Sequence, residues 1–290
     1  MTFISKYAWI VVILNWIVLP VRAQYFVDVF SLNNQWHQAK SQDDSIAQKG
    51  SNTFMNLFVP VPLAKGNTFL FRLSGEQLLL TNDSAQVRLQ SLTMPVGMQW
   101  KFKNPKWKLT TLGIPKWSGT DRHLAFHDNF QYGVYLLGQY TVSDSLRFKL
   151  GIYVNREFFG NLIVPLIGVD WKINHRWSIY GTLPSNFRLS YSIQPQILNM
   201  GVGFKSMARS FRSQTEDQFI RYNELQLKYF MEAILAKHYT FFVEGGFFLG
   251  RAPLLYTNGA NRDEYESSDL LRLMKPFPMM NIGMAYRVFQ

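Results

Sequence analysis

Apolar and polar residues alternate along most of this chain, and that period of two is the feature that most limits its fold. Between Ser145 and Asn155, every second residue is large and apolar: Leu146, Phe148, Leu150, Ile152 and Val154. A β-strand sends successive side chains to opposite faces, whereas a helix would spread these residues around its circumference. The segment is therefore predicted to be a strand with one apolar face and one polar face.

The same alternation recurs from one end of the chain to the other and predicts about 12 strands, or about 14 with two weaker candidates. The confident segments are 52–63, 67–74, 94–103, 130–142, 145–155, 163–173, 176–183, 187–193, 197–205, 224–235, 239–250 and 279–289. The weaker candidates are 24–31 and 107–115.

Three features favour lipid as the surroundings of these strands over a soluble β-sandwich, which would also alternate. The apolar face is large and aromatic in almost every strand. The opposite face carries Arg, Lys, Glu, Gln and Gly, which a dry sandwich core would not accept. Most predicted strands have roughly 9–12 residues, the length that crosses a bilayer at a tilt of about 45°. Because a sheet edge in lipid would leave backbone groups unpaired, the predicted fold is all-β: a closed, transmembrane, antiparallel up-and-down β-barrel.

The N-terminal residues 1–23 have the composition of a cleaved signal peptide. Lys6 precedes an apolar run over residues 8–21 that only Asn15 interrupts, and Val21 and Ala23 flank Arg22 as a small-x-small cleavage site. The run has about 14 residues, fewer than the roughly 20 that a membrane-spanning helix needs. We therefore expect one barrel domain over residues 24–290, located in the outer membrane of a Gram-negative cell.

The mature chain is basic. Without Lys6 and Arg22 it has 28 basic and 19 acidic residues, a net charge of +9. Nucleic acid is not the expected partner of an exported protein. An outer surface facing lipid and lipopolysaccharide, or an interior that attracts anions, agrees better with export.

The links between predicted strands differ in length. Those near 142–145, 174–175, 194–196 and 236–238 are tight, whereas long loops are predicted near 75–92, 104–129, 206–219 and 251–278. Outer-membrane barrels combine short periplasmic turns with longer external loops. Both chain ends are then expected to face the periplasm, which requires an even number of strands.

Two neighbouring segments resemble a known family: Leu166 to Asn174 (LIGVDWKIN) and Trp177 to Pro184 (WSIYGTLP). They are similar to a family of uncharacterised outer-membrane β-barrel proteins, a domain of unknown function, from Bacteroidota-type bacteria. The signal ending at Ala23 is similar to exports from the same group. The resemblance is best over residues 130–205 and thin before residue 90. It implies a fold and a location but no activity, so no catalytic residue is carried over from it.

The last strand carries a second resemblance, to the signal that outer-membrane assembly machinery recognises. The residues that match are Asn281, Gly283, Tyr286 and Val288. The resemblance implies the assembly machinery as a partner. The alternative is an amphipathic strand that contains a glycine for structural reasons.

Residues with catalytic or metal-binding chemistry are few. His123 and His127 are four residues apart beside Asp121 and Asp128, a spacing that places two metal ligands on one face of a helix. The segment looks like a loop and fixes no third ligand, so exposed loop residues are expected. The chain has no cysteine, which excludes disulfides and thiolate metal sites.

An outer-membrane lipid hydrolase would need Ser, His and Asn or Asp together at the lipid-facing rim. No histidine lies in a confidently predicted strand, and phosphate-binding loops and dinucleotide fingerprints are absent from the sequence. No catalytic, cofactor or metal site is therefore predicted, and the chain is not expected to be an enzyme.

The inward face of the barrel is predicted to carry many charges, with bases in excess. These residues are Arg72, Lys101, Lys103, Arg147, Lys149, Asp170, Lys172, Arg176, Arg188, Lys205, Glu224, Lys228, Glu232, Glu244 and Arg287. Such a lumen favours anions, but the same charges could pair across strands and fill a narrow barrel. Two functions stay open: a porin-like channel for small solutes, anions among them, or a closed structural barrel that binds a partner through external loops.

The alternation also predicts the direction in which individual side chains point. Leu150, Val169 and Leu227 are predicted to face lipid near the middle of the membrane. Asp170 and Arg176 are predicted to lie within salt-bridge reach across a hairpin that turns near residues 173–175.

Glu232 and Glu244 fall on the inward face of consecutive strands, and two registers keep both inside. One places the two carboxylates directly opposite each other, where they would have to share a proton. The other places Glu244 opposite Phe230 and diagonal to Lys228. We predict the second register, because the lysine then neutralises the acids.

Overall fold

The computed structural model describes residues 26–40, 47–81, 86–120, 128–195, 197–213, 218–250, 254–257 and 276–289, and almost all of them lie in strands. The strands are β1 (Phe26–Lys40), β2 (Ala47–Pro62), β3 (Thr68–Thr81), β4 (Gln86–Thr93), β5 (Val96–Lys101), β6 (Trp107–Thr120), β7 (Phe130–Ser143), β8 (Leu146–Glu157), β9 (Gly160–Lys172), β10 (Trp177–Leu183), β11 (Asn186–Gln194), β12 (Leu198–Arg212), β13 (Gln218–Leu235), β14 (Tyr239–Gly250), β15 (Leu254–Thr257) and β16 (Phe277–Phe289). One turn of 3-10 helix, η1 (Ala64–Gly66), connects β2 to β3. Within these ranges no helix is long and apolar enough to span a membrane.

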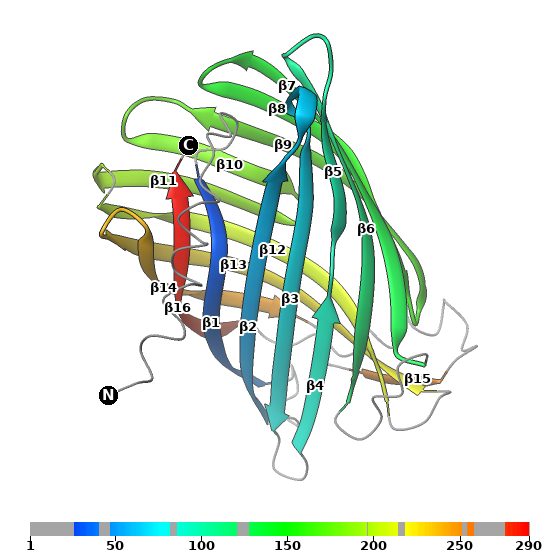
Figure 1. Ribbon diagram of the computed structural model, residues 1–290. Helices are drawn as coiled ribbons and strands as arrows, with labels where there is room; N and C mark the ends of the chain where they lie inside the picture. The colour runs from blue at the N-terminus through cyan, green and yellow to red at the C-terminus, as the bar shows by residue number, and fades with distance from the viewer. Residues whose placement is uncertain are drawn as a thin grey trace, which may run out of the picture.

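The strands form one sheet that closes on itself (Figure 1). Successive strands pair antiparallel around it, and β1 pairs with β16 from Phe26↔Phe289 to His37↔Met279. β4 and β5 share one register against β3, and β15 follows β14 along β13, so each of these pairs occupies one position in the wall. The fold is therefore the predicted closed barrel, with 14 strands. This is the larger of the two expected numbers, because both weak candidates are strands, in β1 and β6.

The two ends of the barrel differ. The terminal end carries both chain termini and most of the tight links, including residues 144–145, 173–176 and 236–238, whereas the two-residue links 158–159 and 184–185 join the opposite ends of their strands. The loop end carries the links after β1, β3, β6, β12 and β15. The signal peptide predicted over 1–23 lies outside the described residues.

The outer face of the barrel is apolar between two groups of aromatic rings. Near the terminal end, Trp107 packs on Tyr140 with ring centroids 4.7 Å apart, and near the loop end Trp117 packs on Phe130 at 5.2 Å. The two tryptophans are ten residues apart on β6, which is about 33 Å along a strand and about 23 Å along the normal at a tilt of about 45°. That height matches the apolar band of a membrane barrel, about 25 Å.

The side chains predicted to face lipid lie on this outer face. Leu150 is 69% exposed and Leu227 is also exposed, while Val169 is paired with Phe148, which points outward as well.

Three segments predicted as long loops are mainly strand. Residues 75–81 and 86–92 belong to β3 and β4, 107–120 to β6, and 206–212 and 218–219 to β12 and β13. Of the fourth segment, Leu254–Thr257 and 277–278 are strand, and the remainder is described only at 276. The prediction was wrong because it sought apolar residues outside and polar residues inside. At the loop end of β3 and β4 this pattern is inverted: Leu78 and Leu89 are fully buried, whereas Gln77 and Gln90 share a hydrogen bond of 3.4 Å.

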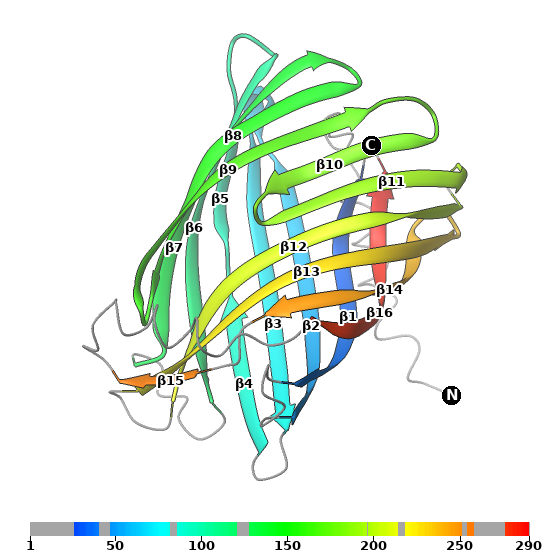
Figure 2. The same ribbon diagram turned by 180° about the vertical axis from the view of Figure 1, so that it is seen from behind.

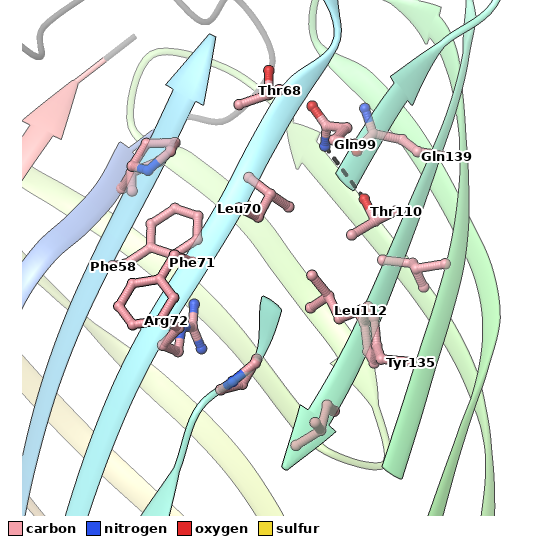
Figure 3. Close-up of a pocket in the computed structure, with 15 residues that line it drawn as sticks. Phe58, Thr68, Leu70, Phe71, Arg72, Gln99, Thr110, Leu112, Tyr135 and Gln139 are labelled. Atoms are coloured by element: carbon pink, nitrogen blue, oxygen red, sulfur yellow. Dashed lines mark hydrogen bonds between the residues drawn. The ribbon is translucent and has the colours of Figure 1, made fainter. Parts of the chain in front are cut away.

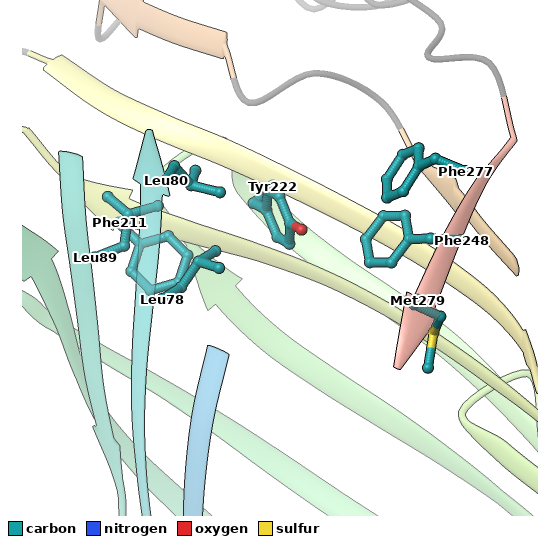
Figure 4. Close-up of a cluster of buried hydrophobic side chains, with 8 residues drawn as sticks. All are labelled: Leu78, Leu80, Leu89, Phe211, Tyr222, Phe248, Phe277 and Met279. Atoms are coloured by element: carbon teal, nitrogen blue, oxygen red, sulfur yellow. The ribbon is translucent and has the colours of Figure 1, made fainter. Parts of the chain in front are cut away.

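The inverted residues belong to an apolar cluster inside the barrel (Figure 4). Its members come from both sides of the lumen: Leu78, Leu80, Leu89, Phe211, Tyr222, Phe248, Phe277 and Met279. A cluster of this kind excludes water from the lumen at the loop end.

The closing element is the extension of β12 and β13 beyond their neighbour β11. Pairing of β11 with β12 ends at Asn186↔Lys205, and residues 207–212 of β12 then pair with β13 until Arg212 meets Gly119 of β6. Figure 2 shows β12 and β13 running across the barrel toward the ends of β6 and β7. We call the described residues of this extension, 207–213 and 218–223, the crossing hairpin.

The outward position of Leu150 gives a stability test. We expect Leu150→Arg to lower the free energy of unfolding by about 2–4 kcal/mol, because the new charge lies in the hydrocarbon. Gln86→Arg, an exposed change at the loop end of β4, is the control and is expected to cost about 0–1 kcal/mol. Urea titration of the protein folded into vesicles measures both. Equal losses would contradict the membrane depth assigned to Leu150.

Candidate functional site

The inner face of β13 organises the barrel interior. Its even-numbered residues from Tyr222 to Glu232 point into the lumen. Their hydrogen bonds, ion pairs and ring contacts reach five other strands, β1, β11, β12, β14 and β16. Gln226, for example, is buried and donates a hydrogen bond of 3.1 Å to Gln35 of β1.

Glu232 lies nearest the terminal end and binds two arginines. Its carboxylate accepts hydrogen bonds from Arg188 at 2.6 Å and from Arg287 at 2.7 Å. Arg287 also binds both carboxylate oxygens of Asp28, at 2.6 and 3.2 Å. A buried carboxylate that receives two guanidinium groups is neutralised, as burial of a charge requires.

The next ion pair confirms the predicted register. Phe230 pairs with Glu244, and Lys228 donates to the Glu244 carboxylate at 2.6 Å. Asn281 donates to the same oxygen at 2.7 Å. Glu232 lies opposite Phe242, so the two glutamates do not form a proton-sharing pair.

Closer to the loop end, an arginine joins opposite walls of the barrel. Arg209 of the crossing hairpin forms ion pairs with Glu76 of β3 and with Glu224 of β13, the latter at 2.7 Å. Asn52 donates to Glu76 at 2.8 Å, and Lys205 lies 3.5 Å from Glu224. All but Lys205 have side chains that water barely reaches, so the lumen is filled at this level.

The crossing hairpin is fastened to the far wall by hydrogen bonds. Ser210 donates to the Glu157 carboxylate from its backbone N–H at 2.9 Å and from its hydroxyl at 2.6 Å. Lys116 forms an ion pair with Glu157 at 2.9 Å, and Ser118 donates to the Ser210 carbonyl at 2.7 Å.

The prediction of lumen charges missed Arg209, Glu76, Glu157, Lys116 and Asp28. Glu76, Lys116 and Arg209 lie in segments predicted as loops, and Asp28 lies in one of the weaker strand candidates. Glu157 could have been found, because it continues the alternation of Arg147 and Lys149 beyond residue 155.

Other predicted lumen charges take different places. Lys149 pairs with Asp170 at 2.6 Å, and Arg147 lies opposite Asp170 in the register of β8 and β9. Arg72, Lys101 and Lys172 are accessible to solvent. Lys103 lies in the turn after β5 and not in the wall.

The predicted Asp170–Arg176 contact is wrong. The β9–β10 turn spans residues 173–176, so Asp170 is paired with Tyr180, and Arg176 is an exposed turn residue. The Arg176 guanidinium donates to the Tyr191 hydroxyl at 2.9 Å instead. The error arose because the turn is one residue longer than expected and moves Arg176 to the rim.

The residues of the proposed assembly signal also have structural roles. Asn281 accepts a hydrogen bond of 3.0 Å from Asn33, besides its bond to Glu244. A Cβ atom at Gly283 would overlap the side chains of Phe242 and Asn33. Tyr286 packs on Tyr239 with ring centroids 5.5 Å apart, and Val288 lies opposite Val27.

His123 and His127 lie outside the described residues. Within the described ranges, no three His, Asp or Glu residues are grouped so that they could hold a metal ion.

Open space lies in the terminal half of the lumen. One cavity of about 330 Å³ is lined by β1, β2, β3, β5, β6 and β7, and another of about 340 Å³ lies beside the β9–β10 turn. Phe26 of β1 lines the second cavity and meets Tyr180 of β10 edge-on, with ring centroids 5.2 Å apart.

The Lys228–Glu244 pair gives a second stability test. Lys228→Gln is expected to lower the free energy of unfolding by about 3 kcal/mol, because it leaves a buried carboxylate without its cation. The double variant Lys228→Gln/Glu244→Gln removes both charges and is expected to recover most of that loss. Urea titration in vesicles measures this difference. A double variant as unstable as the single one would contradict a charge-pairing role for Lys228.

Several solved outer-membrane proteins have similar folds. An outer membrane channel from Pseudomonas putida F1 matches with 9% identity and a TM-score of 0.47, covering 93% of this chain and all of that one. The NanC porin matches with 8% identity and a TM-score of 0.38 over 89% of this chain and 98% of that one. The P. putida toluene transporter TodX matches with 9% identity and a TM-score of 0.42 over 90% and 89%. At these values the likeness says nothing about the solute of this chain.

No curated protein matches the sequence. The model of one protein family, described as Domain of unknown function (DUF6268), matches residues 104–287, which are more than half of the chain. The chain therefore belongs to that family.

Proposed function

We propose that the protein is an outer-membrane channel for small anions whose lumen is closed at rest by the crossing hairpin. The observation that carries this proposal is the set of side-chain contacts that join opposite walls. Arg209 binds Glu76, Ser210 binds Glu157, and the apolar cluster lies at the same end. An open pore would let water reach these inward side chains, yet they are buried.

A basic vestibule at the terminal end supports anions as the solutes. Arg72, Lys101 and Lys172 are exposed to solvent, and Lys108 lies directly opposite Lys101. Bases that line a water-filled mouth concentrate anions in it. The vestibule faces the periplasm in our proposal, since the chain ends and most of the tight turns lie there.

The outer surface supports the proposed location. The apolar band and its aromatic borders fit a bilayer, and the predicted signal peptide would deliver the chain to the periplasm. Lys49, Arg88 and Arg156 lie on the outer face near the loop end. This position fits contact with lipopolysaccharide phosphates. We also propose that residues 281–288 serve as the signal for the assembly machinery.

The second candidate function is a permanently closed barrel that acts through its external loops. The apolar cluster favours it, because separating Phe211 from Leu78 and Leu89 would expose large apolar surfaces to water. The two candidates differ in whether the closure can be removed to leave a working pore.

Single-channel recording in planar bilayers tests the proposal. We expect the natural protein to be silent at rest. A variant in which residues 209–222 are replaced by Asn-Gly, a two-residue hairpin turn, should show persistent conductance that favours anions. Lys149→Ser/Asp170→Ser removes an ion pair between neighbouring strands and should stay silent.

Two outcomes would contradict the proposal. Steady conductance of the natural protein would mean that the lumen is open at rest. A folded hairpin-deletion variant that remains silent would favour the permanently closed barrel.

A further inference from the structure

The cavity of about 330 Å³ in the terminal half has the features of a ligand site (Figure 3). Its lining consists mainly of inward residues from six neighbouring wall strands. Leu70, Leu112, Ile114, Leu137 and Phe58 form an apolar middle. Ligand pockets range from about 300 to 1,000 Å³, and about 150 Å³ holds benzene. The cavity therefore accommodates one aromatic ring with substituents.

Arg72 supplies a positive charge to this cavity and forms no ion pair with another residue that the structure describes. Its guanidinium lies 5.1 Å from the centre of the Phe58 ring, and its side chain is accessible to solvent. The carboxylate of Asp28 does not neutralise Arg72, because both oxygens of Asp28 are bound by Arg287. By contrast, Arg188, Arg209 and Arg287 all form buried ion pairs.

A second, independent feature lies at the other end of the cavity. Gln139 is 7% exposed and lines the cavity, yet its Nε2 atom has no hydrogen-bond partner in the described part of the chain. A buried amide that donates no hydrogen bond is costly and is expected to have a partner in the working protein. Nearby, the Gln99 amide donates to the Thr110 hydroxyl at 3.4 Å.

The cavity is therefore polar at two ends and apolar between them. In the continuous strand formed by β4 and β5, Pro95 lies level with Arg72, and Gln99 is four residues further on, about 13 Å at the rise of a strand. In Figure 3, Gln99 and Gln139 lie at one end, Arg72 at the other, and Leu70 and Leu112 between them.

We propose that this cavity binds an organic monocarboxylate with an apolar, ring-sized body and a hydrogen-bond acceptor at its far end. The Arg72 guanidinium donates to the carboxylate, with which its geometry allows two parallel hydrogen bonds. The apolar residues enclose the body, and the Gln139 amide donates to the distal acceptor. Binding at this site does not depend on opening of the crossing hairpin, so it goes beyond the proposed channel function.

Isothermal titration calorimetry with the full barrel in lipid nanodiscs tests this site. The probe is 3-(4-hydroxyphenyl)propanoate, whose phenol oxygen can accept from Gln139. Two analogues separate the contributions: the corresponding neutral amide lacks the charge, and 3-phenylpropanoate lacks the distal oxygen. We expect saturable binding of one probe per barrel. The neutral amide should bind at least about tenfold more weakly, and 3-phenylpropanoate about threefold to tenfold more weakly.

Variants assign the two contacts. Arg72→Gln should weaken carboxylate binding at least about tenfold and leave the neutral amide unchanged. Arg72→Lys should retain part of the affinity. Gln139→Leu should abolish the preference for the hydroxylated probe over 3-phenylpropanoate. Lys172→Gln removes an equal charge at the other cavity, away from the bound carboxylate, and should weaken binding by no more than about twofold, the share of the general attraction of anions by the vestibule.

Several results would overturn the proposal. These are the absence of saturable binding, equal affinity for the acid and the amide, or an equal loss in Lys172→Gln and Arg72→Gln. The last result would indicate a general attraction of anions by the basic lumen. Heat-dependent migration in electrophoresis checks that each variant is folded. Conductance is measured separately, so failure of this site and failure of the proposed channel can be told apart.

Discussion

Pairing of β1 with β16 is the constraint on which the rest of the structure depends. In lipid, every backbone N–H and C=O group must find a partner within the protein, and only a closed sheet provides this. Once the first and last strands pair, each side chain of the wall faces either lipid or the lumen. A barrel of about eight strands encloses a space that side chains fill, and the diameter grows with the number of strands. The lumen of a 14-stranded barrel is therefore wide enough to hold water. Closing this lumen therefore requires a segment of chain that crosses it, and that segment is the crossing hairpin.

The sequence predicted those parts of the fold in which lipid selects the outer residues. In β8, the outward series from Phe148 to Val154 is wholly apolar, and its strand was found with the correct faces. Near the loop end this selection ends, because the wall there lies beyond the apolar band. Gln77 and Gln90 then face outward, and Leu78 and Leu89 face the enclosed cluster. Because the prediction required apolar residues on the outer face, it assigned these residues of β3 and β4 to a loop.

The interior was predictable where contacts are local in sequence. Lys228 and Glu244 lie on consecutive strands, so parity and charge selected the correct register from two alternatives. Arg209 and Glu76 are 133 residues apart, and no period or spacing joins them. Their contact depends on how far the crossing hairpin bends over the lumen. The hairpin can bend because the β10–β11 hairpin is short and leaves the end of β12 without a neighbour. The sequence of one strand does not show how long its neighbours are.

The chemistry of the closure bears on whether it can open. The hairpin is held to the walls partly by buried ion pairs and hydrogen bonds, at Arg209 and Ser210. Buried ion pairs contribute little net stability, because the attraction is offset by the loss of hydration. Water entering from the vestibule would restore that hydration and make their separation less costly than separation of the apolar cluster. Residues 207–212 of β12 also lack β11 as a neighbour, so on that side the wall pairing that moving the hairpin breaks is the bridge between Arg212 and Gly119. The apolar cluster and the pairing of residues 218–221 with β15 then remain as the main resistance to opening.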